Sequence, residues 1–272
     1  MISFVEFQSL DIEQQPPSPL TVKGKLKLPV SYQRKKSCFI SKKKLPAVVI
    51  LHGSAGVDFR GDFYAQALNA VGIATLEIDM WEAREITSAA DRPPYPLLTY
   101  PDAFGALKFL SEHPNIDQDR IGILGFSWGG IVTMASATEQ YASQFGGELR
   151  FAAHVAHYPV CYAYNNVPLP GGEFHNLTGA PLLIQIGEED DYDDGSAACF
   201  ALKDSLSLKE QSVVEVIAYE GVFHGWDRLQ VPITVVDPFS HHGVGGEVEI
   251  VPDVDHAYES RKKVVRFFRR HL

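Results

Sequence analysis

The stretch Gly125-Phe126-Ser127-Trp128-Gly129-Gly130 places a serine between glycines, directly after the apolar run of residues 121–124. Because the following residues can form a helix, Ser127 falls at the junction of a predicted strand and a predicted helix. At such a junction the serine adopts a strained backbone conformation, and bulky flanking residues would collide. The pattern is typical of a nucleophile elbow, which projects the serine hydroxyl above the edge of a sheet.

An acidic loop follows a second predicted strand, downstream of the elbow. Residues 181–186 form an apolar run of strand length, which ends at Gly187 and leads into an acidic stretch. The carboxyl ends of parallel strands meet at one edge of a sheet, so a carboxylate on this loop lies on the same edge as Ser127. We predict that Asp190, three residues beyond Gly187, is the acid of a catalytic triad.

Three further aspartates lie close to Asp190 and stay open as alternatives: Asp191, Asp193 and Asp194. The simpler interpretation of these three is a solvated acidic loop that caps a helix near residues 195–208, because negative charge stabilises a helix N-terminus.

A histidine follows the next predicted strand. Residues 213–219 are rich in β-branched side chains, and their exit loop contains His224 between Phe223 and Gly225. Among the ten histidines, only His224 follows a strand downstream of the acid in this setting. In enzymes with a nucleophile elbow, the serine, the acid and the histidine follow one another in this order along the chain. We therefore predict that His224 is the general base. The later histidines are predicted at the surface: His241, His242, His256 and His271.

An early strand, residues 47–51, runs into the small-residue turn His52-Gly53-Ser54-Ala55-Gly56. A strand-to-helix loop at this place supplies one backbone N–H of an oxyanion hole, and the residue after the nucleophile supplies the other. The sequence therefore predicts the N–H groups of Ser54 and Trp128 as oxyanion donors.

The glycine turn, the elbow, the acidic loop and the histidine loop together resemble the dienelactone hydrolase family of α/β-hydrolases. The resemblance covers nearly the whole chain and implies a cofactor-free hydrolase of small esters or lactones, with Ser127, Asp190 and His224 as triad. Two residues depart from the family pattern, which has a cysteine nucleophile and an acidic residue on the early loop; here they are Ser127 and Gly53. A general serine esterase is the resulting expectation. A serine peptidase, a thioesterase and a non-catalytic binding protein with this fold stay open.

The order of predicted elements indicates an α/β fold, with a mostly parallel central sheet covered by helices on both faces. We expect a single domain over residues 1–272, because no linker or repeat divides the chain. Residues 2–9 and 21–28 alternate apolar and polar side chains, which suits antiparallel edge strands. The other predicted strands are residues 45–51, 73–79, 120–125 and 152–158, and the predicted helices are residues 62–71, 102–112, 128–138 and 255–271.

The formal net charge of −10 argues against a nucleic-acid partner, which would require a clustered basic surface. Two basic clusters occur. One lies in a polar connection between early strands and is interpreted as a solvated loop, and the other complements the dipole of the last helix. The first comprises Arg34, Lys35, Lys36, Lys42, Lys43 and Lys44, and the second Arg261, Lys262, Lys263, Arg266, Arg269 and Arg270.

The cysteines Cys38, Cys161 and Cys199 lack metal-site spacing, and their odd number excludes a fully paired disulfide framework. A reducing, cytoplasmic compartment is the expectation, with no membrane span and no bound metal. Some members of the resembled family carry export signals, so an exported form stays open.

Two irregular segments, residues 80–99 and 158–178, leave strands at the active edge and are candidate lids. In the first segment we predict that Arg84 and Trp81 contact substrate. A guanidinium matches a substrate carboxylate, and the resembled family uses an arginine in a comparable region. The alternative for Arg84 is an ion pair with Glu82, Glu85 or Asp79 that fixes the loop.

Overall fold

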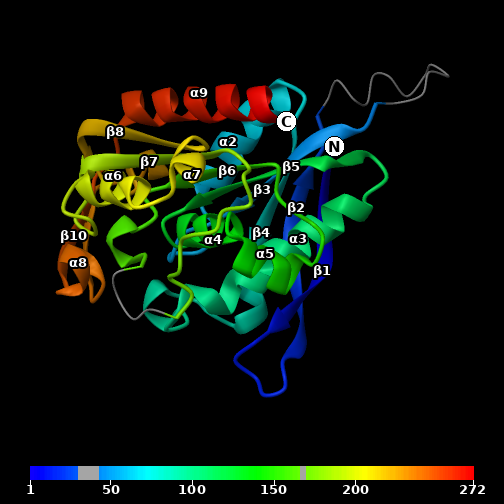
Figure 1. Ribbon diagram of the computed structural model, residues 1–272, viewed down its shortest axis with the longest axis horizontal. Coiled ribbons are helices and arrows are strands. Elements are labelled where there is room, and N and C mark those ends of the chain that lie inside the picture. The colour runs from blue at the N-terminus through cyan, green and yellow to red at the C-terminus, as the bar shows by residue number, and fades with distance from the viewer. Residues whose placement is uncertain (30–42, 166–169) are drawn as a thin grey trace.

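A computed structural model of the chain describes residues 1–29, 43–165 and 170–272. Its central element is an eight-stranded sheet with the order β1-β2-β4-β3-β5-β6-β7-β8 (Figure 1). The β1–β2 and β2–β4 pairs are antiparallel, and the described pairs from β4 to β8 are parallel. The strands are β1 Ile2–Asp11, β2 Ser18–Lys27, β3 Leu45–Leu51, β4 Ala74–Asp79, β5 Ile116–Phe126, β6 Ala153–His157, β7 Leu182–Glu189 and β8 Val214–Phe223.

Burial along the strands explains their places in the sheet. The central strand β6 is buried at every residue, as expected for a parallel strand covered on both faces. The edge strand β1 alternates exposed with less exposed side chains, so only one of its faces packs on the core. The predicted mostly parallel α/β fold with an antiparallel edge is therefore confirmed.

Helices cover both faces of the sheet: α2 and α9 lie above it in Figure 1, and α3 and α5 lie below. The last helix, α9, buries Val264, Phe267 and Phe268. A side chain at Gly122 of β5 would lie 2.6 Å from the Phe268 ring, so the helix packs closely on the strand. The helices are α2 Phe59–Ala70, α3 Tyr100–Glu112, α4 Trp128–Ser136, α5 Glu139–Gly146, α6 Ala197–Asp204, α7 Leu208–Gln211, α8 Ser240–Gly243 and α9 Val254–His271.

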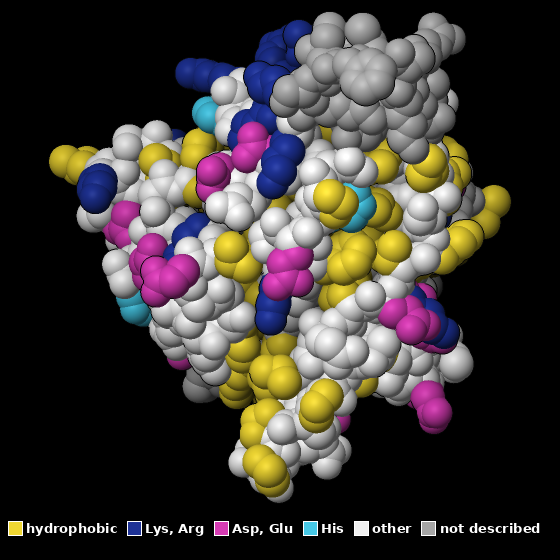
Figure 2. Space-filling view, turned by 90° about the vertical axis from the view of Figure 1, so that its right-hand side faces the viewer, with side chains coloured by type: hydrophobic (Ala, Val, Ile, Leu, Met, Phe, Trp, Pro, Cys, Tyr) yellow, Lys and Arg dark blue, Asp and Glu magenta, His cyan; other side chains and the backbone are white. Residues whose placement is uncertain are grey.

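The basic cluster of α9 is at the end where the sequence analysis placed it, since Arg269 and Arg270 lie in its last turn. Lys and Arg side chains gather at the top of the face shown in Figure 2, near the end of this helix. Of the other basic cluster, Lys43 and Lys44 are described, whereas Arg34, Lys35, Lys36 and Lys42 lie outside the described residues, as does Cys38.

Two features were absent from the sequence analysis. A small second sheet pairs β9 (Ile233–Asp237) with β10 (Gly246–Ile250), and α8 connects the two strands. A disulfide joins Cys161 to Cys199, whereas the sequence analysis expected cysteines in a reducing compartment. A count of three cysteines shows that one must stay unpaired, but it does not show which two residues the fold brings together.

No helix among the described residues is long and apolar enough to cross a membrane.

Candidate active site

Ser127 lies between the end of β5 and the start of α4, with φ 51° and ψ −111°. This positive φ is unfavourable for a residue with a side chain, so the surrounding structure must hold it. A side chain at Gly125 would lie 1.9 Å from the carbonyl oxygen of Gly129, which explains the glycines around the serine. The Ser127 N–H donates to the carbonyl oxygen of His157 at 3.0 Å, which fixes the turn to β6.

A chain of hydrogen bonds connects Ser127, His224 and Asp190. The Ser127 Oγ lies 3.0 Å from His224 Nε2, and His224 Nδ1 lies 2.7 Å from Asp190 Oδ2. An ionised carboxylate only accepts, so Nδ1 carries the ring proton and Nε2 is free to accept from the serine hydroxyl. The structure thus brings together the three predicted triad residues, which come from loops after β5, β7 and β8.

The imidazole of His224 is packed between two tyrosine rings. The ring centroids of Tyr158 and Tyr192 lie 4.6 Å and 4.5 Å from it. His224 and Asp190 are both buried, and Asp190 Oδ1 accepts a hydrogen bond from the Tyr192 N–H at 2.9 Å. These contacts restrict the rotation of the ring and of the carboxylate, so the geometry around Ser127 is held before any ligand binds.

The other three aspartates of the acidic loop have different partners. Asp191 accepts from the Glu249 N–H, and Asp194 contacts His241. Asp193 accepts from the N–H groups of Cys161 and Tyr162 at 2.8 Å and 2.7 Å. In the described structure these three hold neighbouring segments, and Asp190 is the one that contacts His224.

The expectation that Asp193 is solvated was wrong, because this side chain is 1% exposed. Burial, together with the nearby negative charge of Asp190, raises the pKa of Asp193 to about 8. The sequence shows only an acidic loop, and the fold turns one of its members inward against the segment that follows β6.

The predicted oxyanion loop is fixed by the buried His52. Its Nε2 accepts from the Met80 N–H at 2.9 Å, so Nδ1 carries the proton and donates to the Gly53 carbonyl at 2.8 Å. Burial lowers the pKa of His52 to about 4, which keeps the ring neutral and preserves this pattern. The His52 carbonyl accepts from the Gly129 N–H at 3.1 Å, so the loop is tied directly to the elbow. A side chain at Gly53 would lie 3.6 Å from Ser127 Cβ, which shows how closely the loop approaches the serine.

Trp81 does not line the cavities beside Ser127, contrary to the substrate-binding role predicted for it. Its side chain is buried, and its Nε1 donates to the Ser54 carbonyl at 3.0 Å. Its ring packs against those of His52 and Trp128, at centroid distances of 5.0 Å and 5.4 Å. Trp81 therefore packs against the loop of residues 52–56, which carries the predicted oxyanion donor Ser54.

Arg84 is likewise absent from both cavities and forms an ion pair instead. Its guanidinium donates to both carboxylate oxygens of the buried Asp102, at 2.7 Å and 3.2 Å. It also donates to the carbonyl oxygens of Met80 and Leu98. These contacts correct the prediction of a substrate contact: Arg84 fixes the segment after β4, through an aspartate that the sequence analysis had not considered as its partner.

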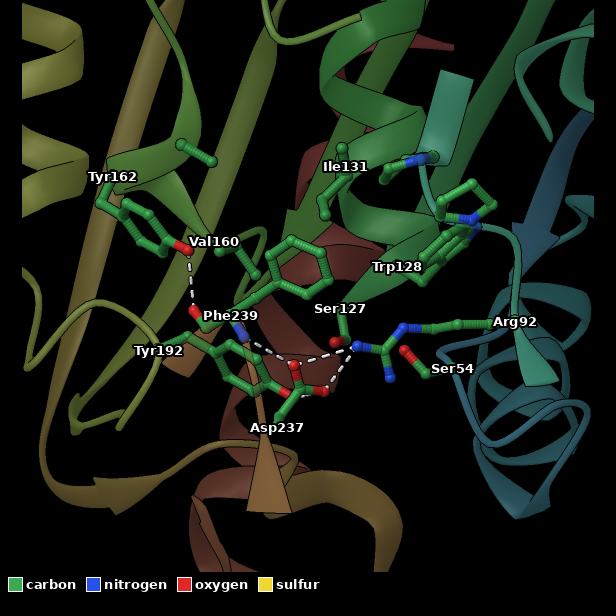
Figure 3. A pocket seen from close by; sticks show the side chains of 13 residues that line it. Ser54, Arg92, Ser127, Trp128, Ile131, Val160, Tyr162, Tyr192, Asp237 and Phe239 are labelled. Atoms are coloured by element: carbon green, nitrogen blue, oxygen red, sulfur yellow. Dashed lines mark hydrogen bonds and ion pairs between the residues drawn. The ribbon is translucent and has the colours of Figure 1, made fainter. Parts of the chain in front are cut away.

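The space beside Ser127 is lined by the start of α4, by Ser54 and Tyr192, and by three further segments (Figure 3). Arg92, Pro94 and Pro96 come from the segment after β4, and Val160, Tyr162 and Ala163 come from the segment after β6. Both predicted candidate lids thus reach the cavity. The β9–β10 hairpin adds Asp237 and Phe239, which the sequence analysis missed. The β-branched runs of residues 233–236 and 248–251, separated by glycines, were the signal for this hairpin.

A second, fully buried histidine–aspartate pair lies behind the site. His157 Nδ1 lies 3.2 Å from Asp227 Oδ2, and both side chains are inaccessible to solvent. The hydroxyls of Tyr158 and Tyr64 donate to Asp227 at 2.6 Å and 2.7 Å, and Arg60 donates to the Tyr158 hydroxyl at 2.9 Å. Burial alone would raise the pKa of Asp227, but the hydrogen bond from His157 and the nearby positive charge of Arg60 lower it below its ordinary value. This network supports the Tyr158 ring against His224.

Among the described residues, potential metal ligands come close together at Cys161, Asp193 and Cys199. A cysteine binds a metal as a thiolate, whereas these two sulfurs are joined in the disulfide. The group therefore cannot hold a metal in this covalent state.

The sequence was compared with protein families and with known proteins. Residues 36–271 match the model of the dienelactone hydrolase family. A probable 2-oxo-3-(5-oxofuran-2-ylidene)propanoate lactonase of Bradyrhizobium is 25% identical over 194 residues, which cover 67% of this chain and 74% of that protein. An uncharacterized peptidase of Bacillus subtilis, YtmA, is 55% identical over 38 residues, 14% of this chain and 15% of that protein.

Solved structures share the architecture at low identity. The dienelactone hydrolase of Anabaena variabilis superposes with a TM-score of 0.62 at 16% identity, covering 100% of this chain and 99% of that one. An esterase of Pyrobaculum calidifontis gives 0.63 at 17% identity, with 99% and 85% coverage. Since the family model spans most of the sequence and its fold is the one observed here, the chain belongs to the dienelactone hydrolase family.

Proposed function

We propose that the protein is a single-domain serine hydrolase that cleaves small carboxylic esters or lactones through Ser127, His224 and Asp190. The observation that carries this proposal is the continuous hydrogen-bonded chain from Asp190 through His224 to Ser127, at the meeting point of two cavities. A serine hydroxyl is a weak nucleophile unless a neighbouring base accepts its proton, and His224 Nε2 is in place to do so.

In the proposed mechanism, His224 accepts the Ser127 proton as Oγ attacks the carbonyl carbon of the ester. Asp190 holds the imidazole in the required tautomer and stabilises its charged form. The N–H groups of Ser54 and Trp128 donate to the oxyanion, and the first N–H groups of α4 are suited to this because a helix leaves them without an intrahelical partner. His224 then gives the proton to the leaving oxygen, and water releases the acyl group by the same steps.

The lactonase relative favours an ester or lactone substrate over an amide. The match to a peptidase of Bacillus covers 14% of this chain, whereas the match to the lactonase covers 67%. A thioesterase would use the same residues, since the triad does not select the leaving group. Turnover of p-nitrophenyl acetate, a dienelactone, an acyl thioester and a peptide amide by the purified protein separates these activities.

Labelling by a fluorophosphonate tests the proposed nucleophile. The parent protein should be labelled, Ser127→Ala should not be labelled, and Ser127→Ala should lose about 10⁶-fold in kcat on p-nitrophenyl acetate. Ser111→Ala is a matched control, because the Ser111 hydroxyl is occupied with the Lys108 carbonyl on α3. Parental turnover by a pure Ser127→Ala preparation would exclude Ser127, and a parent that neither reacts nor turns over would favour the binding protein.

For the location, the Cys161–Cys199 disulfide favours the exported alternative over a cytoplasmic one, because disulfides persist in oxidising compartments. Mass spectrometry of the protein isolated from its native host, after alkylation without reduction, tests this. Free thiols at both residues would support the cytoplasm.

A further inference from the structure

Two cavities of different size meet at Ser127. The volume open to the centre of a water-sized sphere is about 50 Å³ in the inner cavity and about 620 Å³ in the outer cleft. Ser54 and Ser127 line both spaces. Trp128, Ile131 and Val160 line the inner cavity alone, whereas His224, Gly225 and Val236 line the outer cleft alone.

An ion pair between Arg92 and Asp237, which we name the latch, lies where the two spaces meet (Figure 3). Arg92 Nη2 lies 2.8 Å and 3.0 Å from the two carboxylate oxygens of Asp237. The Tyr192 hydroxyl and the Phe239 N–H also donate to this carboxylate, at 3.0 Å and 2.9 Å. The latch thus connects the segment after β4 to the β9–β10 hairpin across the front of Ser127.

The position of His224 decides which part of an ester enters which space. In the proposed mechanism the imidazole must deliver its proton to the leaving oxygen, so the alcohol portion lies on the side of His224. His224 lines only the outer cleft, and the acyl portion must point away from it. On the basis of the proposed function, we infer that the inner cavity binds the acyl group and the outer cleft binds the alcohol.

The lining of the inner cavity defines the acyl group further. Ile131, Val160 and Ala163 present aliphatic surface, Trp128 and Tyr162 add aromatic rings, and the small volume of the cavity limits the length of the acyl group. The two charges at its mouth are paired with each other in the latch, so they leave no net charge for an acid group on the acyl chain. The substrate class is therefore an ester of a short, uncharged carboxylic acid with a larger alcohol.

Matched truncations in the two spaces test this assignment. Ile131→Ala removes side-chain atoms and enlarges the inner cavity. Val236→Ala likewise enlarges the outer cleft. A methylene in an apolar pocket changes kcat/KM by about 10-fold or more. We therefore expect Ile131→Ala to raise the ratio of kcat/KM for p-nitrophenyl hexanoate over acetate by about 10-fold, and Val236→Ala to change it by less than about twofold.

A substitution that fills the inner cavity should change the hexanoate-to-acetate ratio in the opposite direction. Ala163→Leu should lower the same ratio, because the larger side chain occupies the inner cavity. Thermal melting of each variant shows that the comparison is made on folded protein.

The outcomes separate this inference from the proposed function. A ratio that responds to Val236→Ala but not to Ile131→Ala or Ala163→Leu overturns the assignment of the two spaces, while esterase activity of the parent keeps the proposed function intact. Absence of both ester turnover and fluorophosphonate labelling in the parent overturns the proposed function and this inference with it.

Discussion

Two histidine–aspartate pairs lie close together in this molecule, and they make the same bond. His224 directs Nδ1 at Asp190 at 2.7 Å, and His157 directs Nδ1 at Asp227 at 3.2 Å. Both histidines lie at the carboxyl ends of sheet strands, and each carboxylate follows a strand as well, Asp190 after β7 and Asp227 after β8. A search for histidine–aspartate contacts alone would give both pairs the same rank as catalytic candidates.

The second ring nitrogen distinguishes the two pairs. His224 Nε2 faces the hydroxyl of Ser127 at 3.0 Å, on the wall of the outer cleft. His157 Nε2 accepts from the Gln185 amide at 2.8 Å inside the core, where no solvent reaches it. In both pairs the aspartate sets the tautomer of the histidine. Only a histidine whose second ring nitrogen faces a nucleophile beside a cavity can act as a general base.

The charges around the two carboxylates also differ. Asp227 receives two tyrosine hydroxyls and lies near the cation of Arg60, so its charge is compensated. Asp190 instead has a second carboxylate, Asp193, as a neighbour. Tyr158 connects the two regions, because its hydroxyl contacts Asp227 and its ring packs on His224. The buried network around Asp227 thus holds the Tyr158 ring that packs on His224.

Among changes to the two pairs, the largest effect is expected where the Asp190–His224 pair is broken. Asp190→Asn should lower kcat on p-nitrophenyl acetate by about 10⁴-fold, because an amide can donate to Nδ1 and stabilise the wrong tautomer. Asp191→Asn and Asp194→Asn are matched controls with partners on the β9–β10 hairpin, and each should stay within about tenfold of the parent. Steady-state kinetics on the three variants checks this. A large loss at either control, with Asp190→Asn near normal, would transfer the acid role to that residue.

Breaking the Asp227–His157 pair should lower the stability of the protein and leave kcat nearly unchanged. Asp227→Asn leaves the Nδ1–H of His157 and the hydroxyls of Tyr158 and Tyr64 with a poorer acceptor in the core, and a hydrogen bond to a charged group contributes about 1.5 to 3 kcal/mol. We expect a fall of about 3 kcal/mol in the free energy of unfolding, measured by urea denaturation. At a temperature where the variant is folded, kcat should stay within about tenfold of the parent. Unchanged stability with a thousandfold lower kcat would give the second pair a direct part in the reaction.

Local patterns were sufficient to predict that Ser127, Asp190 and His224 lie together. Ser127, Asp190 and His224 each follow a recognisable strand, and the rule that parallel strands end at one edge brings them together. The glycines of the elbow carried the same information, because the turn leaves no room for a side chain at Gly125 or Gly129. Strand signals and steric requirements are local, so they can be read from short stretches.

Contacts between distant segments could not be predicted in this way. Arg84 and Arg92 lie on the same irregular segment, and the path of that segment in space decides that Arg84 meets Asp102 while Arg92 meets Asp237. The disulfide partners Cys161 and Cys199 are 38 residues apart and approach only when α6 packs beside the segment after β6. Long-range pairing of this kind depends on tertiary packing, and no periodicity in a single sequence encodes it.

The smallest expected effect concerns Asp193, which lies beside Asp190 and has no cation partner among the described residues. Its pKa is raised from 3.8 to about 8 by burial and then by Asp190, so the folded protein holds a proton there that the unfolded chain has lost. The stabilising contribution of this proton is complete below pH 4 and is lost as the pH rises towards 8. Asparagine does not titrate, so Asp193→Asn should not lose stability in this way. The free energy of unfolding of the variant minus that of the parent should therefore increase between pH 4.5 and 8.5. We expect an increase of at least about 1.4 kcal/mol, which corresponds to one pKa unit. Urea denaturation of both proteins across this range measures the difference. A difference that stays flat with pH would mean that the two N–H donors keep Asp193 ionised despite its burial.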